Sequence, residues 1–294
     1  MSLELRQPLP TSWSKCRLAH IVREMGGSTP SKAEPKFWNG NVPWVSPKDM
    51  KRDLIDDSID HVTEAAVRET ALKPVPLGST LIVVRGMILA HTVPVAQTTA
   101  PVTLNQDMKA LVPYGVDGAF LRWLLKASQS RLLALVEESG HGTRCLRSEL
   151  WRALEVAIPP EGGQRAIADF LDEKTAAIDA LIEKKERLIA LLAEKRAALI
   201  HQAVTKGLDP TVPMKPSGIP WIGDIPAHWT RTVVKRGCRS IRDGSHNPPP
   251  RFPDGHHRLL SARNIQQGEF ILRDDDRRMT ADAFRELERS YTVR

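Results

Sequence analysis

The chain has 294 residues, of which 41% are apolar and 26% charged, a composition typical of a folded protein in water and unlike that of a disordered one. Its formal net charge of +7 favours acidic partners such as nucleic acid. Cys16, Cys145 and Cys238 stand far apart, which argues against a disulfide framework and a structural zinc site. No apolar run approaches the roughly 20 residues of a membrane span, and no signal peptide begins the chain, so we expect a cytoplasmic protein.

The first part of the chain, residues 1–163, mixes strand and helix signals. Residues 79–84 form an apolar run that predicts a strand, residues 120–136 have a helical pattern, and residues 154–158 lead to Pro159-Pro160. Loops rich in glycine and proline separate these segments. The pattern predicts a globular domain of the mixed α/β (α+β) class and leaves its topology open.

The strongest local signal lies between Gln164 and Lys206, where apolar residues recur at steps of three and four, as in an amphipathic helix. Gly162-Gly163 is expected to break the chain before this helix, and Gly207 to end it. A helix of roughly 40 residues is about 60 Å long, too long for one small domain to cover. Its apolar face therefore needs a partner. The positions expected to pair are Ile178, Leu181, Ile182, Leu188, Leu192 and Leu199.

Two lysines, Lys185 and Lys195, interrupt this apolar seam. The interruption favours an antiparallel or heterologous coiled-coil pairing over an ideal dimeric zipper. The alternative is a long helix that packs on its own domain.

The sequence on either side of the helix partly repeats itself. Residues 9–13 (LPTSW) are echoed by residues 225–229 (IPAHW), an offset of 216 residues, and residues 27–29 and 44–50 correspond to 244–246 and 259–265. We therefore predict two copies of one domain, residues 1–163 and 210–294, joined by a spacer helix over 164–209. Their net charges are +2 and +5 around a neutral spacer. Because Arg294 corresponds to about position 78, the second copy is expected to be incomplete.

Catalytic signatures are missing: the sequence has no GxGxxG, GxxxxGK[ST], HExxH or GxSxG motif. Residues 247–250 (NPPP) resemble the Asn-Pro-Pro-aromatic loop of amino-methylating DNA methyltransferases. Pro250 cannot stack on a flipped base, however, so a plain proline-rich loop is favoured.

Two further clusters have ordinary explanations. His246, His256 and His257 with Cys238 fit no zinc spacing. The run Asp274-Asp275-Asp276 is typical of a solvated turn. A basic, duplicated chain without a catalytic constellation is expected to be a binding module that measures two sites at a fixed separation, with no metal and no cofactor.

Four blocks of the sequence resemble the specificity subunit of type I restriction-modification enzymes. Residues 26–32 (GGSTPSK) look like a loop of its first target-recognition domain, and residues 158–172 (IPPEGGQRAIADFLD) like the entry to its conserved helix. Residues 203–209 (AVTKGLD) resemble the exit from that helix, and residues 217–229 (SGIPWIGDIPAHW) the start of the second target-recognition domain.

The resemblance implies a non-catalytic subunit in which each recognition domain reads one half of a bipartite site on double-stranded DNA, with the helix as a ruler. It also implies that methyltransferase subunits dock on the helix. Through them the restriction subunits, which carry ATP-dependent translocation and cleavage, would join the complex. A cut second domain further suggests a self-dimer that restores two recognition domains.

Polar and basic loop residues are the expected DNA contacts, since Arg reads guanine, Asn reads adenine and Lys binds phosphate. Trp13, Trp44 and Trp229 are expected to anchor the core or the loops and not to stack on bases. The candidates are Thr29, Ser31, Lys32, Lys48, Arg85 and Arg144 in the first copy and Arg242, Ser245, His246, Arg251, Arg263 and Asn264 in the second.

The residues alone leave a different class of function open. A coiled-coil adaptor with basic ends that bind protein or RNA has the same charge distribution and the same long helix.

Overall fold

The structure is a computed structural model that describes residues 10–138, 142–239, 241, 252, 254–266 and 268–292. The chain divides into two compact units, which meet between Leu192 and Ala193 inside the long helix α5. Four of the sequence-predicted DNA contacts, Arg242, Ser245, His246 and Arg251, lie outside the described residues, as does the proline-rich loop 247–250.

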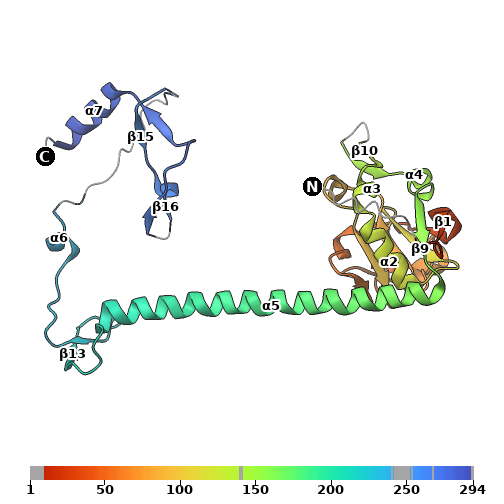
Figure 1. The fold of residues 1–294 in the computed structure, drawn as a ribbon, viewed down its shortest axis with the longest axis horizontal. Coiled ribbons are helices and arrows are strands. Elements are labelled where there is room, and N and C mark those ends of the chain that lie inside the picture. Colours follow the sequence, from red (N-terminus) through yellow and green to blue (C-terminus); the bar gives the residue numbers. More distant parts are fainter. Residues whose placement is uncertain are drawn as a thin grey trace. The chain divides into compact units, whose positions relative to one another are not determined.

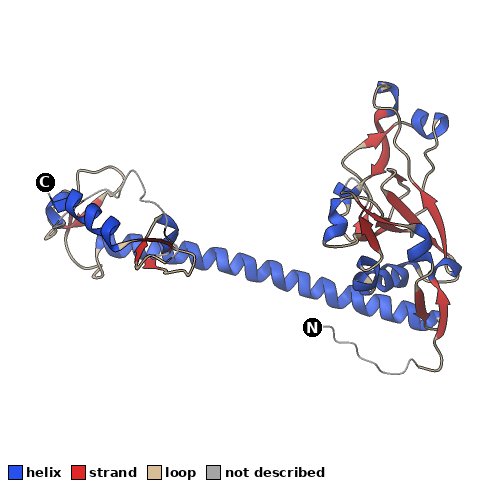
Figure 2. Cartoon of the chain, turned by 90° about the horizontal axis from the view of Figure 1, so that it is seen from above, coloured by secondary structure: helices blue, strands red, loops and turns tan. Residues whose placement is uncertain are grey.

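The core of the first unit is a five-stranded sheet in the order β2-β9-β6-β7-β4. Its strands are β2 (Val22–Gly26), β9 (Met108–Pro113), β6 (Thr80–Val83), β7 (Val95–Thr98) and β4 (Leu54–Ile55), antiparallel except for the β4/β7 pair. All four residues of β6 are buried, and the strand falls within the predicted segment 79–84. Figure 2 shows these strands with helices packed against them.

The segment predicted as helical, residues 120–136, contains two helices and the start of a strand. They are α2 (Gly118–Ala127), α3 (Gln129–Leu133) and β10 (Val136–Glu138). The Asp117 carboxylate caps α2 by accepting a hydrogen bond from the Phe120 amide at 2.9 Å. β10 forms a hairpin with β11 (Arg144–Leu146), followed by α4 (Ser148–Arg152).

A second sheet of the first unit has the order β5-β3-β8, with β3 (Trp38–Val45), β5 (His61–Val62) and β8 (Thr103–Leu104). It packs with α1 (Glu64–Glu69) around a small core of its own. The short helices η1 (Leu18–His20), η2 (Pro35–Phe37), η3 (Pro47–Asp49) and η4 (Met87–Ala90) connect the strands. An antiparallel pair of strands joins the two ends of this domain: β1 (Ser14–Arg17) pairs with β12 (Glu155–Ile158), which lies immediately before α5.

α5 spans Glu161–Lys206, 46 residues, as one continuous helix (Figure 1). The prediction that Gly162-Gly163 breaks the chain is wrong, because both glycines lie in the first turn, where amide groups need no partner within the helix. The helix ends as predicted at Gly207, whose φ of +79° suits glycine. Among the described residues, no helix combines the length and the apolar character needed to cross a bilayer.

The second unit contains short elements. Two hairpins pair β13 (Met214–Pro216) with β14 (Asp224–Pro226) and β16 (Ile265–Gln266) with β17 (Glu269–Phe270). β15 (His257–Leu259) pairs with β18 (Arg277–Met279). The helical segments are α6 (Val234–Gly237), η5 (Ala262–Asn264) and α7 (Ala281–Thr292).

The sequence repeat has a structural counterpart around η3 and η5. Ser46 and Ser261 each cap their helix through a reciprocal capping box, with Asp49 and Asn264 as the third residue. The two turns therefore have the same local architecture.

Two more features recur at offsets within one residue of 216. A Cβ on Gly40 would lie 2.4 Å from the Val62 carbonyl oxygen, and a Cβ on Gly255 would lie 2.5 Å from that of Met279, so both positions require glycine. The Thr63 hydroxyl accepts a hydrogen bond from the amide at position 66, as the Thr280 hydroxyl does from the amide at position 283. Residues 40–66 and 255–283 thus share a local fold, while the domain boundaries at 163/164 and 209/210 stay predictions.

The two units differ in how much apolar surface they bury. Among the described residues of the second unit, Ile225 and Met279 are the buried apolar side chains, whereas Val234, Phe270 and Leu272 are exposed.

We expect the amides of β6 and β9 to exchange hydrogen at least about 100-fold more slowly than those of the second unit, because exchange follows local burial. Hydrogen exchange followed by mass spectrometry measures this, and equal protection in β15 and β6 would contradict it.

Candidate nucleic-acid interface

The loop from Gly27 to Lys32 is held against the first unit by its backbone. A Cβ on Gly27 would lie 1.9 Å from the Asn105 carbonyl oxygen, so only glycine allows this approach. The Ser28 amide donates to the Leu104 carbonyl oxygen at 2.9 Å. The loop therefore begins from a fixed point on β8.

Two tryptophans hold the rest of this loop. Trp44 Nε1 donates to the Ser28 carbonyl oxygen at 2.9 Å, and Trp38 Nε1 donates to the Ser31 carbonyl oxygen at 3.1 Å. Their rings meet edge to face at 5.2 Å. Trp44 is thus a loop anchor, as its sequence context predicts.

The three candidates in this loop differ in what their side chains contact. The Thr29 hydroxyl donates to Gln106 Oε1, and the Ser31 hydroxyl accepts from the Ala33 amide at 3.3 Å. Lys32 is exposed and has no ion pair within the described residues. Lys32 is therefore the member of this loop whose charge is available to a phosphate.

Lys48 and Arg263, which occupy matching positions of the repeat, are each paired with an acid at matching positions. Lys48 Nζ lies 2.6 Å from Asp60 Oδ2, and Arg263 Nη2 lies 3.0 Å from Asp276 Oδ1. Arg263 Nη1 also contacts Asp275 Oδ2 at 2.9 Å. The repeat therefore preserves an ion pair beside each turn, and these cations contact phosphate only in competition with it.

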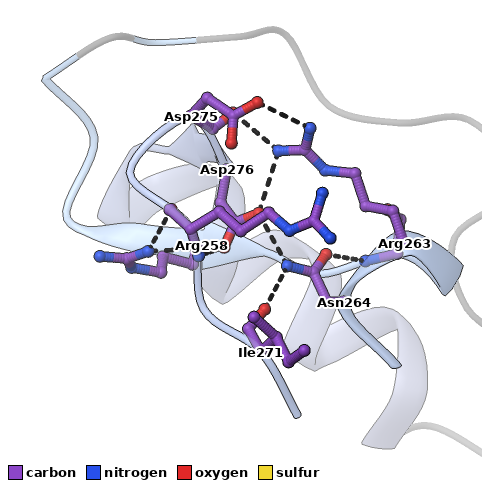
Figure 3. A network of polar contacts seen from close by, with 8 residues as sticks. Arg258, Arg263, Asn264, Ile271, Asp275 and Asp276 are labelled. Carbon is purple, nitrogen blue, oxygen red and sulfur yellow. Dashed lines mark hydrogen bonds and ion pairs between the residues drawn. The ribbon is translucent and has the colours of Figure 1, made fainter. Parts of the chain in front are cut away.

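Asn264 and Asp276 lie at the centre of a polar network in the second unit (Figure 3). Asn264 Oδ1 accepts from the Ser261 amide at 3.0 Å, while Nδ2 donates to the Ile271 carbonyl oxygen at 2.9 Å and to Asp276 Oδ1 at 2.7 Å. Asn264 is buried. In this conformation its amide is occupied by the protein and is not presented to an adenine.

Asp276 is the acceptor on which this network converges. Its side chain is fully buried and accepts hydrogen bonds from the Arg273 amide at 2.7 Å and from Asn264 and Arg263. The hydrogen bonds from the Arg273 amide and from Asn264 lower the pKa of Asp276 to about 2. The prediction of a solvated acidic turn over residues 274–276 is therefore wrong for Asp276, since the network removes its carboxylate from solvent.

Arg85 and Arg144, far apart in the sequence, are brought together in the first unit. Arg85 forms a β-bridge with Cys145, and the Gly86 amide donates to the Arg144 carbonyl oxygen at 3.0 Å. Arg85 is exposed, and Arg144 contacts Glu138 at 3.5 Å. The bridge thus brings the backbones of Arg85 and Arg144 together.

Sequence reasoning missed two residues at this place. Met87 and Ile88 are the first two residues of η4, which begins two residues after Arg85. Their side chains are 66% and 41% exposed. Large exposed apolar side chains that follow an exposed arginine suit contacts with the sugar and base edges of a nucleic-acid groove. Only the exposure found in the structure distinguishes them from the buried residues on either side, Val84 and Leu89.

The apolar positions predicted to pair along α5 are exposed. Ile178, Leu181 and Leu192 are each 55% exposed. Every residue from 176 to 202 is exposed, so the alternative of a helix packed along its own domain does not hold for this stretch. Ile182, Leu188 and Leu199 are exposed in the same way.

The fold and these surfaces define a class of protein: a mixed α/β domain with polar loops, partly repeated beyond a long helix whose apolar positions are exposed. Residues 10–190 match the family model described as the type I restriction modification DNA specificity domain. The chain therefore belongs to this family, which confirms the resemblance inferred from its sequence blocks.

Two curated relatives share this assignment. The chain is 35% identical over 176 residues to the type I restriction enzyme EcoR124I/EcoR124II specificity subunit of Escherichia coli, a match that covers 59% of this chain and 44% of the relative. It is 30% identical over 184 residues to the MjaIX specificity subunit of Methanocaldococcus jannaschii, covering 61% and 40%. The matches thus span less than half of either relative.

A solved structure supports the fold. One chain of a structure described for complex assembly and conformational transition of the type I R-M system has a TM-score of 0.57 at 19% identity, and the match covers 70% of this chain and 49% of that one. This likeness agrees with the predicted mixed α/β domain followed by a long helix.

The low pKa of Asp276 predicts acid sensitivity of the second unit. Because the folded-state pKa of about 2 lies below the ordinary value of 3.8, the ionised carboxylate stabilises the fold above about pH 4, and this stabilisation is lost as the pH falls through about 2. We expect hydrogen-exchange protection of β15 and β18 to fall over this range and to fall less in Asp276→Asn. Asp274→Asn, at an exposed acid beside it, is the matched control and should behave as wild type.

Proposed function

We propose that this chain is the DNA-reading component of a type I restriction-modification complex. The observation that carries the proposal is the pairing of family membership with the repeated turn, in which Ser46 and Ser261 cap equivalent helices on either side of α5. Two related surfaces joined by a long helix suit a DNA site with two separated halves. We assign residues 1–163 and 210–294 to the recognition domains and 164–209 to the spacer.

The first recognition domain contacts DNA in two ways. Lys32 and Arg85, both exposed and unpaired within the described residues, supply charge to phosphates, which gives affinity that falls with salt. Arg144, with Met87 and Ile88 beside it, is suited to reach base edges. The remaining candidates mainly hold their loops in shape through contacts within the protein; they are Thr29, Ser31, Lys48 and Arg263.

α5 serves as ruler and docking helix. Its exposed leucines and isoleucines receive helices of methyltransferase subunits, through which restriction subunits join. Methylation and ATP-dependent cleavage belong to those partners, so the chain itself is non-catalytic.

The proposal predicts a two-part methylation motif. The chain and a methyltransferase subunit encoded beside it should be co-expressed in a host without adenine methylation, and methyladenine mapped by single-molecule sequencing. We expect one motif made of two short specific sequences separated by unspecified bases. A single contiguous motif would overturn the bipartite assignment.

That motif then supplies the duplex for a binding test. Lys32→Ala combined with Arg85→Ala should weaken binding of the complex by roughly 10-fold or more and reduce the slope of log K against log salt by about 2, one for each lost phosphate contact. Arg68→Ala, which removes an exposed cation already paired with Glu64 at 3.4 Å, is the control and should change neither. Tighter binding to single-stranded RNA than to the duplex would favour the adaptor function.

A second copy of this chain is the other candidate partner for α5, because exposed apolar side chains run along the helix from Ile178 to Leu199. We expect light scattering of the chain alone to give twice the chain mass of 32.8 kDa. Leu188→Lys should return it to a monomer, because a charge within an apolar helix pair lacks a partner. A monomeric wild-type protein would exclude the self-dimer and leave the methyltransferase subunits as the occupants of this face.

A further inference from the structure

The first turns of α5 are anchored on the first unit along one stripe. Gln164, Ala168 and Asp172 are spaced four residues apart, so they lie on the same face of the helix. Gln164 and Ala168 are buried. Gln164 Oε1 accepts from the Asp117 amide at 2.7 Å, and its Nε2 donates to the Pro159 carbonyl oxygen at 3.0 Å.

Asp172 is the last member of this stripe and contacts two residues of α2, which lies beside α5 (Figure 1). Its Oδ1 accepts from Arg122 Nη2 at 2.5 Å and from Trp123 Nε1 at 2.8 Å. The Arg122 guanidinium also lies 4.8 Å from the centre of the Trp123 ring. We call these three residues the helix clamp.

The clamp joins a buried guanidinium to a half-exposed carboxylate. The Arg122 side chain is 4% exposed and that of Asp172 is 45% exposed, while the other acid near Arg122, Asp53, has its Oδ2 3.7 Å from Arg122 Nη1. A guanidinium buried in this way depends on its carboxylate partners, because the protein shields it from most of the solvent. Without Asp172 it keeps one more distant partner, so Arg122 is expected to turn toward solvent and leave α5 unattached at this level.

The clamp lies where α5 loses contact with the sheets and helices that precede it in the first unit. Thr175 is half-buried, and every residue from 176 to 202 is exposed. The helix continues for 34 residues beyond Asp172, to Lys206, about 50 Å at ~1.5 Å per residue. A tilt of about 5° at the clamp therefore moves the far end by roughly 4 Å, more than the ~3.4 Å rise of one base pair.

We propose that the helix clamp fixes the direction in which α5 leaves the first recognition domain and so sets which spacing of the two half-sites is accepted. Arg122, Trp123 and Asp172 are positioning residues, and none of them needs to touch DNA. The part of this proposal that concerns spacing rests on the proposed function, whereas the part that concerns helix direction does not.

Helix direction is tested by distances between two spin labels in the full chain. Cysteines replace Lys73, exposed in the first unit, and Ala190, exposed on α5, after Cys16, Cys145 and Cys238 are changed to serine. We expect the distance distribution to broaden about two-fold in Asp172→Ala. It should remain unchanged in Asp179→Ala, which removes an exposed α5 carboxylate without a partner in the described residues. An unchanged width in Asp172→Ala would overturn the proposal.

Asp172→Asn provides a milder variant should the alanine variant fail to fold. It keeps an oxygen acceptor for Trp123 Nε1 but removes the negative charge that faces Arg122. We expect an intermediate broadening. A wild-type width in a folded Asp172→Asn together with an unfolded alanine variant would show a role in stability alone and overturn the proposal.

Spacing is tested by mapping methyladenine with the same variants and a methyltransferase subunit. We expect Asp172→Ala to keep both half-site sequences and to accept spacings one base pair shorter and longer than the wild type. Unchanged spacing, or equal loss of methylation at all sites, would overturn the role in spacing even if the labels show a broader distribution. If the wild type gives no two-part motif, the proposed function fails, and the label distances still decide whether the clamp fixes the helix.

Discussion

Burial of strand β6 is the constraint on which the first unit depends. All four of its residues are buried between β9 and β7, and α2 contacts all three strands. Burying side chains such as Leu81, Ile82 and Val83 contributes about 1.5–3 kcal/mol each. Two residues beyond this strand the chain reaches Arg85 and then η4, so the exposed side chains of Arg85, Met87 and Ile88 follow closely on a fully buried strand.

The two copies of the capped turn each contain a buried carboxylate, but at different positions of the repeat. In the first copy Asp49 is buried and accepts from the Ser46 and Ile59 amides, each at 2.8 Å, while Asp60 stays partly exposed beside Lys48. In the second copy the downstream acid, Asp276, is fully buried. A carboxylate at position 264 would lie against it and repel it, so an amide that donates to Asp276 takes that place.

The sequence predicted those features that depend on neighbouring residues. The apolar period located α5, the apolar run located β6, and the repeat located the paired turns. The pairing of β1 with β12 depends on contacts between residues 14 and 158, which no local pattern encodes. The hydrogen bonds of the Asn264 amide depend on Ile271 and Asp276, and the exposure of Met87 depends on the packing around it, so neither is encoded in the neighbouring sequence.

The five-stranded sheet leads to the Arg85 segment and also supports the start of the long helix. Asp53, the second acid beside Arg122, immediately precedes β4, which pairs with β7, and the Gln97 amide of β7 donates to the Asp53 carbonyl oxygen at 2.8 Å. β7 in turn pairs with β6, whose end carries Arg85. The segment that leads to Arg85 and Asp53, the second acid beside Arg122, therefore belong to one continuous set of hydrogen-bonded strands, β6, β7 and β4.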